Sequence, residues 1–303
     1  MIRLSDKTYT YTKARKSLKF GELSLIESGT LFIVATPIGN LEDITLRALR
    51  ILAEVDLIAA EDTRHSQRLL QHYDISTRLT SLHDHNESQR AIQLIEKLKL
   101  GQNIALISDA GTPLISDPGY SLVRQCTEAE VKVVPLPGPC AAITALCAAG
   151  LATDRFMFEG FLPVKAVAKQ QALQRLLTET STSVFYESPR RVVDTVKLIV
   201  EELGENRQMV VAKELTKTFE TFYSGSAQAC LTWLEADANH QRGEFVLMIA
   251  GEKQDQTEVS ADALNLLKLL VKELPLKKAA AVTAEQYGLK KNQLYQLGIE
   301  LKL

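Results

Sequence analysis

The stretch NIALISDAGTPLISDPG (residues 103–119) decides the fold. Its first part, NIALI (residues 103–107), is largely apolar and β-branched, which predicts a buried parallel strand. The segment SDAGTPLISDPG (residues 108–119) begins where that strand ends, and Asp109 is its first carboxylate. In open α/β sheets, ligands bind beyond the carboxyl ends of the strands. This segment is therefore a candidate ligand-binding loop.

The chemistry of this loop favours a cationic or polyhydroxyl ligand over a phosphate. It contains no lysine or arginine, and its polar side chains are carboxylates and hydroxyls, namely Asp109, Asp117, Ser108, Thr112 and Ser116. These groups would repel a phosphate, whereas an ammonium, a sulfonium or a ribose would suit them. Two glycines, Gly111 and Gly119, allow the backbone to approach a ligand closely. A tight turn whose aspartates cap a helix is the alternative interpretation.

Short apolar runs alternate with helical patterns along the chain, which is typical of βαβ units. Strands are expected at residues 31–36, 56–60, 103–108, 131–136, 182–187, 208–213 and 244–250. A helix is expected over residues 86–100, with Asn86 as its N-terminal cap and Gly101 at its end. The sequence therefore predicts an α/β fold.

The chain is expected to comprise a basic N-terminal extension (1–29), an α/β lobe (30–150), a second α/β lobe (151–252) and a helical segment (261–303). The boundary between the lobes is placed where the small-residue helix AAITALCAAG ends, at Gly150. In the last segment, Pro275 and Gly288 separate three amphipathic patterns, which outline a helix-turn-helix. A three-helix cap that only packs on a neighbour has the same pattern.

The net charge of −2 over 303 residues hides a segregation of charge. Residues 1–29 hold six Lys or Arg against three Asp or Glu, and residues 261–303 hold seven against four. Such basic ends can contact nucleic acid phosphates, although a solvated surface explains them almost equally well. No apolar run approaches the roughly 20 residues of a membrane span, and the N-terminus has no continuous apolar core of a signal peptide. We therefore expect a cytoplasmic protein.

The cysteines and histidines do not predict a metal site. The cysteines have no C-x-x-C spacing and lie in apolar surroundings, so we expect reduced, buried thiols at Cys126, Cys140, Cys147 and Cys230. His83 and His85 could bind a metal with Asp84 or Glu87. Without a cysteine or a further histidine nearby, hydrogen-bonding or substrate-facing roles are the preferred interpretation.

Polar clusters follow most of the expected strands. They are TPIGN (36–40), AEDTRHS (60–66), HDHNE (83–87), PGPCAA (137–142), YESPRR (186–191) and AKELTK (212–217). Glu187 is either a general base or the ion-pair partner of Arg190 and Arg191, and the ion pair is the stronger expectation for a glutamate near two arginines. The pair Lys213 and Glu214 has the same two interpretations.

These clusters, together with the Asp109 loop, FEGFLP and GEFVLMI, resemble the tetrapyrrole-methylase superfamily in sequence and order. Within it the chain is similar to the ribose 2′-O-methyltransferases that act on a cytidine in the decoding region of small-subunit rRNA, and the resemblance covers residues 30–303. It implies a two-lobed α/β fold of the class III methyltransferases, usually a homodimer, which holds S-adenosylmethionine between its lobes. A tetrapyrrole C-methyltransferase and a non-catalytic RNA- or cofactor-binding protein are the alternatives.

The resemblance also implies roles for individual residues. The expected cofactor contacts are Pro37, Gly39, Asp109, Ala110, Gly111, Thr112, Cys140, Ala141, Tyr186, Met248 and Ala250. The expected substrate-facing residues are Glu61, Asp62, Arg64, His83, Asp84, Asn86, Arg190, Lys290 and Lys291. The candidate base is Glu187 or Glu214, helped by Lys213 or Lys217, and it rests only on their position at expected strand ends. Relatives often have histidine in place of Arg190, which weakens any scheme with an imidazole base there.

Overall fold

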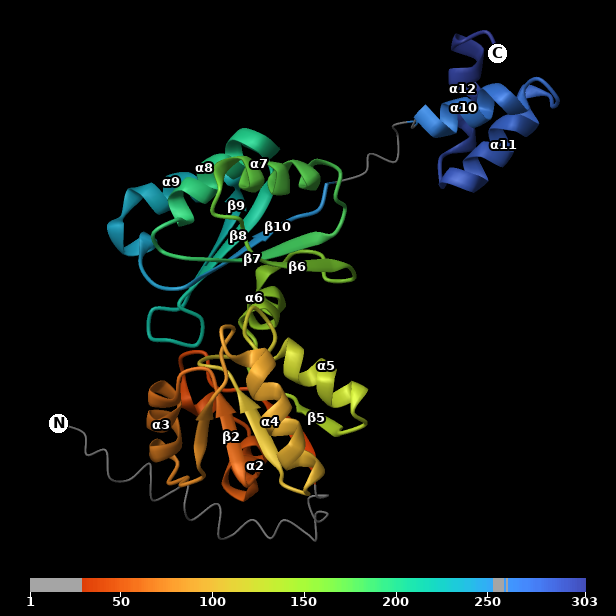
Figure 1. The fold of residues 1–303 in the computed structure, drawn as a ribbon. Coiled ribbons are helices and arrows are strands. Elements are labelled where there is room, and N and C mark those ends of the chain that lie inside the picture. The colour runs from red at the N-terminus through yellow and green to blue at the C-terminus, as the bar shows by residue number, and fades with distance from the viewer. Residues whose placement is uncertain (1–28, 253–258, 260) are drawn as a thin grey trace. The chain divides into compact units, whose positions relative to one another are not determined.

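The computed structural model describes residues 29–252, 259 and 261–303 (Figure 1). The chain divides into two compact units, Met1–Ala141 and Ala142–Leu303. The division falls at the start of helix α6 (Ala141–Ala149), whereas the expected lobe boundary lies at the other end of that helix. Except for Gly29, the N-terminal extension predicted at residues 1–29 lies outside the described residues.

Five parallel strands form the sheet of the first unit, in the order β3-β2-β4-β1-β5. They are β1 (Thr30–Val34), β2 (Leu57–Ala60), β3 (Leu79–Ser81), β4 (Ile104–Ile107) and β5 (Lys132–Leu136). All four residues of β4 are buried, so the buried parallel strand predicted before the Asp109 loop is confirmed. The short edge strand β3 was not expected from the sequence.

Helices cover both faces of this sheet, as Figure 1 shows. The elements are η1 (Leu41–Asp43), α2 (Leu46–Glu54), α3 (Thr63–His72), α4 (Glu87–Lys99) and α5 (Tyr120–Glu128). Successive strand residues point to opposite faces: Phe32 and Ile58 pack with α2 and α3, and Leu31 and Ile104 pack with α4 and α5. Burial on two faces explains why these strands are apolar runs instead of alternating patterns.

The sheet of the second unit is mixed, in the order β6-β7-β10-β8-β9. Its strands are β6 (Phe156–Phe161), β7 (Thr182–Glu187), β8 (Gln208–Lys213), β9 (Thr221–Ser226) and β10 (Phe245–Ile249). Only β6 and β7 are parallel neighbours, and the pairs β7–β10, β10–β8 and β8–β9 are antiparallel. The expected βαβ pattern is present in β6–α7–β7, whose strands are parallel, but it fails at β8 and β9, which are antiparallel and joined by a loop without a helix.

The helices of the second unit pack against its sheet and form an apolar core with it. They are α7 (Ala166–Gln174), η2 (Arg175–Leu177), α8 (Val192–Leu203), α9 (Ala227–Ala236) and η3 (Ala238–Gln241). Val196 and Ile199 of α8 pack with Phe185, Val211 and Leu247 of the sheet.

The chain ends in three helices, α10 (Ala261–Leu270), α11 (Leu276–Tyr287) and α12 (Lys291–Glu300). Pro275 precedes α11 and Gly288 ends it, as the sequence predicts. A small core holds the helices together, with Leu267, Ala280 and Leu294 fully buried in it. The helical segment is thus confirmed.

All four cysteines are free thiols. Cys126 and Cys230 are buried, but Cys140 is half-buried and Cys147 is exposed, so the expectation of buried thiols is wrong for Cys147. Helix α6 is apolar around most of its circumference, and its composition did not reveal which side faces solvent. Within the described part of the chain, no helix is long and apolar enough to cross a membrane.

Candidate functional site

Backbone and side-chain hydrogen bonds join three loops at the carboxyl ends of β1, β4 and β5. Thr36 and Gly111 exchange two N–H to C=O bonds, each of 2.9 Å. The hydroxyl of Thr112 donates to the carbonyl of Pro139 at 2.9 Å. Gly111 has a φ of 84°, in the left-handed region that glycine adopts without strain. The predicted cofactor residues of the first unit therefore lie on connected loops, namely Pro37, Gly39, Asp109, Ala110, Gly111, Thr112, Cys140 and Ala141.

An acidic cluster surrounds the Asp109 loop. Burial and the charges of Asp109, Asp117 and Asp84 raise the pKa of Glu61. Burial and the charges of Asp109 and Asp84 raise the pKa of Asp117 to about 6, against a hydrogen bond from Ser108. Like charges at close range disfavour ionisation, and a cation placed among them would relieve the repulsion. The electrostatics of the cluster therefore suit a positively charged ligand.

The ends of β2 and β3 contribute further polar groups to this edge. The backbone N–H of Asp62 donates to Oδ1 of Asp109 at 3.1 Å, which ties the β2 end to the Asp109 loop. The Asp62 carboxylate in turn caps α3 by accepting from the N–H of Arg64 at 2.8 Å. Glu61 and Asp84 belong to the acidic cluster described above, and the side chain of Arg64 is exposed.

Asn86 does not cap α4 with its side chain, although it occupies the expected position. Its Oδ1 accepts from the backbone N–H of His83 at 2.9 Å, and its Nδ2 lies 3.1 Å from Nε2 of the same histidine. The amide side chain is therefore used to fix His83. No group of three or more His, Cys, Asp or Glu in the described residues could hold a metal ion.

At the end of β7, the Glu187 side chain is completely buried and both of its oxygens are engaged. Oε1 accepts from the backbone N–H of Ser188 at 2.8 Å and lies 3.3 Å from Nε of Arg191. Oε2 accepts from the hydroxyl of Thr195 at 2.7 Å. This geometry favours the ion-pair interpretation of Glu187, with Arg191 as the partner. Arg190 is exposed.

A second charged group follows β8. Nζ of Lys217 lies 2.9 Å from Oε1 of Glu214 and 3.0 Å from Oε2 of Glu244. Burial alone would raise the pKa of Glu214, but hydrogen bonds from Lys217 and from the Glu244 N–H outweigh it and lower that pKa. Lys213 is buried and donates to the carbonyl of Asn239. Glu214 and Lys217, whose side chains remain 20% and 28% exposed, are thus the accessible pair.

The predicted contacts of Tyr186, Met248 and Ala250 do not fall at one end of the second sheet. The Tyr186 hydroxyl accepts from the N–H of Ala142 at 3.2 Å, near the end of β7. Because β10 is antiparallel to β7, Met248 pairs with Val184, and Ala250 lies beyond the opposite end. Met248 has no exposed surface. The antiparallel register, which the sequence did not reveal, separates these residues.

Sequence reasoning missed several residues that shape these groups. Arg191 was named only as one of two possible partners of Glu187, and Thr195 was not named. Glu244, which precedes β10, contacts Lys217 in the loop after β8, so no local motif could have indicated it. Asp117 was recognised as a carboxylate of the loop but was not assigned to the site. In the C-terminal helices, Lys290 and Lys291 are exposed at the start of α12, as a substrate-facing role requires.

Two family models match the chain. The model for tetrapyrrole (corrin/porphyrin) methylases matches residues 30–230, and the model for the RsmI C-terminal HTH domain matches residues 257–302. Among solved structures, a cobalt precorrin-4 methyltransferase covers 75% of this chain and 98% of its own with a TM-score of 0.55 and 16% identity. This likeness supports the fold, with its two α/β units.

Closer relatives share most of the sequence. The ribosomal RNA small subunit methyltransferase I of Escherichia coli O157:H7 is 58% identical over 90% of this chain and 95% of its own. The protein of the same name from Haemophilus influenzae is 58% identical over 90% of this chain and 97% of its own. The chain therefore belongs to the tetrapyrrole (corrin/porphyrin) methylase family, in the group of the ribosomal RNA small subunit methyltransferases I.

Proposed function

We propose that this protein methylates the ribose 2′-hydroxyl of a cytidine in the decoding region of small-subunit rRNA, with S-adenosylmethionine as the methyl donor. The observation that carries the proposal is the 58% identity to rRNA small subunit methyltransferases, which extends over 90% of the chain. The C-terminal HTH match at residues 257–302 adds support, because a tetrapyrrole substrate gives no reason for such a segment. It favours the rRNA over the tetrapyrrole alternative.

The acidic cluster of the first unit suits this cofactor. S-adenosylmethionine supplies a methyl group on a positively charged sulfur, which becomes neutral when the methyl group leaves. The carboxylates of Asp109 and Asp117 would hold the cationic end of the cofactor, and Asp109 could also accept from a ribose hydroxyl. The joined backbones of Thr36 and Gly111 would keep this surface rigid, which reduces the entropy cost of binding. Pro37, Gly39, Cys140 and Ala141 would line the same surface.

Glu214 and Lys217 are the proposed groups for the reacting hydroxyl. Glu214 would accept its proton at a carboxylate oxygen, while Lys217 holds that carboxylate in place at 2.9 Å. The lowered pKa of Glu214 keeps it ionised but makes it a weak base. Positioning of the hydroxyl can lower the activation free energy by about 7–11 kcal/mol. This corresponds to a larger rate factor than the ~10²–10⁴ that a general base supplies. We therefore assign most of the acceleration to orientation.

Glu187 and Lys213 have a supporting role in this proposal. The buried Glu187 carboxylate holds Arg191 and Thr195, and Lys213 holds the carbonyl of Asn239. The basic groups that would meet rRNA phosphates are exposed ones: Arg64, Arg190, Lys290 and Lys291. Action on ribosomal RNA would place the activity in the cytoplasm. The family resemblance also implies a homodimer, which sedimentation equilibrium would test.

The test is transfer of labelled methyl from S-adenosylmethionine to small ribosomal subunits that lack the modification. We expect label in the rRNA, at one cytidine whose 3′ phosphodiester resists alkaline hydrolysis because its 2′-oxygen is blocked. Deproteinised rRNA as a parallel substrate shows whether the assembled subunit is required. Label in a free tetrapyrrole, or none in either form of the rRNA, would overturn the proposal.

A further inference from the structure

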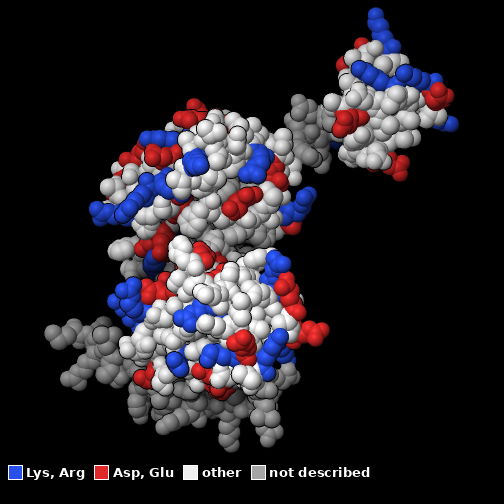
Figure 2. All heavy atoms as spheres, in the orientation of Figure 1, with Lys and Arg blue, Asp and Glu red and all other residues white. Residues whose placement is uncertain are grey.

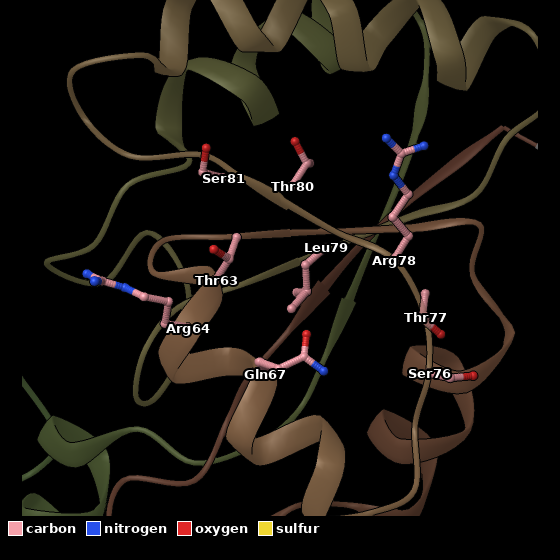
Figure 3. Close-up of a pocket in the computed structure, with 9 residues that line it drawn as sticks. All are labelled: Thr63, Arg64, Gln67, Ser76, Thr77, Arg78, Leu79, Thr80 and Ser81. Atoms are coloured by element: carbon pink, nitrogen blue, oxygen red, sulfur yellow. The ribbon is translucent and has the colours of Figure 1, made fainter.

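A polar groove lies beside the edge strand β3, within the first unit. It has a volume of about 800 Å³, and its walls come from α3, from the segment before β3 and from β3 itself. Figure 3 shows Arg64 and Arg78 at opposite ends of the labelled residues, with Gln67 and Leu79 between them. The remaining lining residues carry hydroxyls, namely Thr63, Ser76, Thr77, Thr80 and Ser81.

Most of these hydroxyls are free to bind a ligand. Thr77 donates to the carbonyl of Leu52 at 2.6 Å. The other four, which belong to Thr63, Ser76, Thr80 and Ser81, have no hydrogen-bond partner among the described residues. Hydroxyls and guanidinium groups together are donors suited to the oxygens of a phosphate. The groove therefore differs from the acidic cluster, in which the described residues supply carboxylates and no cation.

The positive charge continues on the other side of Arg78. The lining of a second pocket, of about 170 Å³, includes Arg78 together with Arg90 and Lys97 of α4, beside polar and leucine side chains. We call Arg64, Arg78, Arg90 and Lys97 the β3 strip. Three of its members form no ion pair within the part of the chain that the structure describes, and only Arg64 has a carboxylate at 3.5 Å, that of Asp62. Figure 2 shows separate Lys and Arg groups on the face of this unit, with uncharged surface and some Asp and Glu side chains between them.

We propose that the β3 strip binds the phosphodiester backbone of a segment of the substrate RNA, an inference that rests on the proposed function. The strip leads toward the site, because β3 ends at Ser81 and the chain continues to His83 at the same edge as the Asp109 loop. The three residues of β3 advance about 10 Å, and one strand of a duplex carries a phosphate for about every 3.4 Å of helix axis, so the strip can meet more than one phosphate.

A second copy of the chain fits this edge less well. An edge strand can pair with another copy, but β3 has only three residues to offer. A two-fold symmetric contact would also bring the same cations of both copies together. A polyanion would pair with the cations and also accept hydrogen bonds from the free hydroxyls. Charge complementarity thus favours RNA as the occupant.

The test compares Arg78→Glu with Arg47→Glu, which makes the same charge change on an exposed arginine of α2 that lines neither pocket. For each variant we would measure the Kd for unmethylated small subunits at several salt concentrations, KM and kcat, the cofactor affinity and the sedimentation mass. We expect Arg78→Glu to weaken subunit binding and raise KM about tenfold or more, and to flatten the salt dependence. The kcat at saturating subunits and the cofactor affinity should stay within about twofold of the wild type, as should every value for Arg47→Glu.

The outcomes separate this inference from the proposed function. If the wild type methylates rRNA and Arg78→Glu binds subunits like Arg47→Glu, the β3 strip is not an RNA site, and the proposed function stands. If the wild type binds subunits through Arg78 but transfers no methyl group, the strip stands and the proposed function fails. A change in sedimentation mass with unchanged RNA affinity would identify the edge as a contact between copies, which also overturns the inference.

Discussion

Carboxylates lie at strand ends in both units, but their surroundings are opposite. In the first unit, Glu61 and Asp117 face other carboxylates, and burial with mutual repulsion raises the pKa of each. In the second unit, Glu187 and Glu214 are held by Arg191 and Lys217, and backbone N–H groups complete their hydrogen bonds. Among the described residues, no cation lies in the first group, whereas the second group contains Arg191 and Lys217. The presence of a carboxylate alone therefore does not predict a ligand. The charges of the neighbouring side chains decide which ligand the carboxylate can bind.

The largest expected effect concerns the neutralised group of the second unit. Glu187→Ala removes the ion-pair partner of the partly buried Arg191, which keeps its hydrogen bond to the Leu162 carbonyl, and loss of one member of a buried pair costs about 3–5 kcal/mol. We expect the lower end of that range, since Arg191 is 26% exposed. Urea denaturation measures this loss of unfolding free energy when it is followed by the fluorescence of Trp233. This residue is the single tryptophan and lies in the second unit, like Glu187. Glu187→Gln, which keeps an acceptor, should lose less. A Glu187→Ala protein with wild-type stability and no methyl transfer would instead make this carboxylate a catalytic one.

In the acidic group, loss of a carboxylate should weaken cofactor binding more than it weakens the fold. Asp109→Ala removes one charge-assisted hydrogen bond of about 1.5–3 kcal/mol, which corresponds to a roughly 10- to 150-fold weaker cofactor affinity. Titration calorimetry with S-adenosylmethionine measures this, and Glu96→Ala, an exposed carboxylate of α4, is the control. Unchanged affinity would show that the Asp109 loop is a turn whose aspartates serve only the fold.

A glycine pair tests whether Glu214 acts in the reaction. A Cβ at Gly243 would lie 2.4 Å from Oε1 of Glu214, whereas a Cβ at Gly204 would meet nothing within 4 Å. Both glycines have positive φ, at 96° and 88°, so alanine strains the backbone at each. We expect single-turnover methyl transfer to fall about tenfold more in Gly243→Ala than in Gly204→Ala. Equal rates in the two variants would exclude Glu214 from the chemistry.

The smallest effect is a pH dependence in the acidic group. The pKa of Asp117 rises on folding from 3.8 to about 6, so its ionisation opposes the folded state. The protonated form of Asp117 stabilises the folded state, and the free energy of unfolding should therefore fall as the pH rises from about 4 to about 6. A bound cation favours the ionised form, so cofactor affinity should increase a few-fold from pH 5 to pH 7. Asp117→Asn should flatten that increase in calorimetric titrations. An identical pH profile in the variant would mean that the cofactor does not contact this carboxylate.

The sequence predicted the first unit better than the second. The apolar run before Asp109 defines β4, because a two-sided burial leaves little choice of residue type. Its loop, with two glycines and no cation, pointed to a cationic ligand without any structure. The three-residue β3 was too short to produce a periodic signal. The groove beside β3 was therefore not foreseen.

The second unit was harder to predict because its strand directions depend on long-range pairing. The β-branched runs of β7, β8 and β10 were recognised, but their periodicity carries no information on parallel or antiparallel neighbours. The resulting register moves Met248 and Ala250 away from Tyr186. The contact of Lys217 with Glu244 likewise joins residues that are distant in sequence. Local motifs identified which residues are polar at strand ends, and only the fold showed which of them are paired.

The reciprocal bonds between Thr36 and Gly111 restrict how this protein can vary. One inserted residue in either loop would shift the bonding groups by about 3.3 Å and break both bonds at once. The fold should therefore tolerate insertions and deletions in the exposed part of the second loop, at Ile115 and Ser116, and reject them at residues 36–39 and 109–112. A library of single-residue insertions across these loops should show a sharp change at Thr112, from insertions that prevent folding to insertions that permit it.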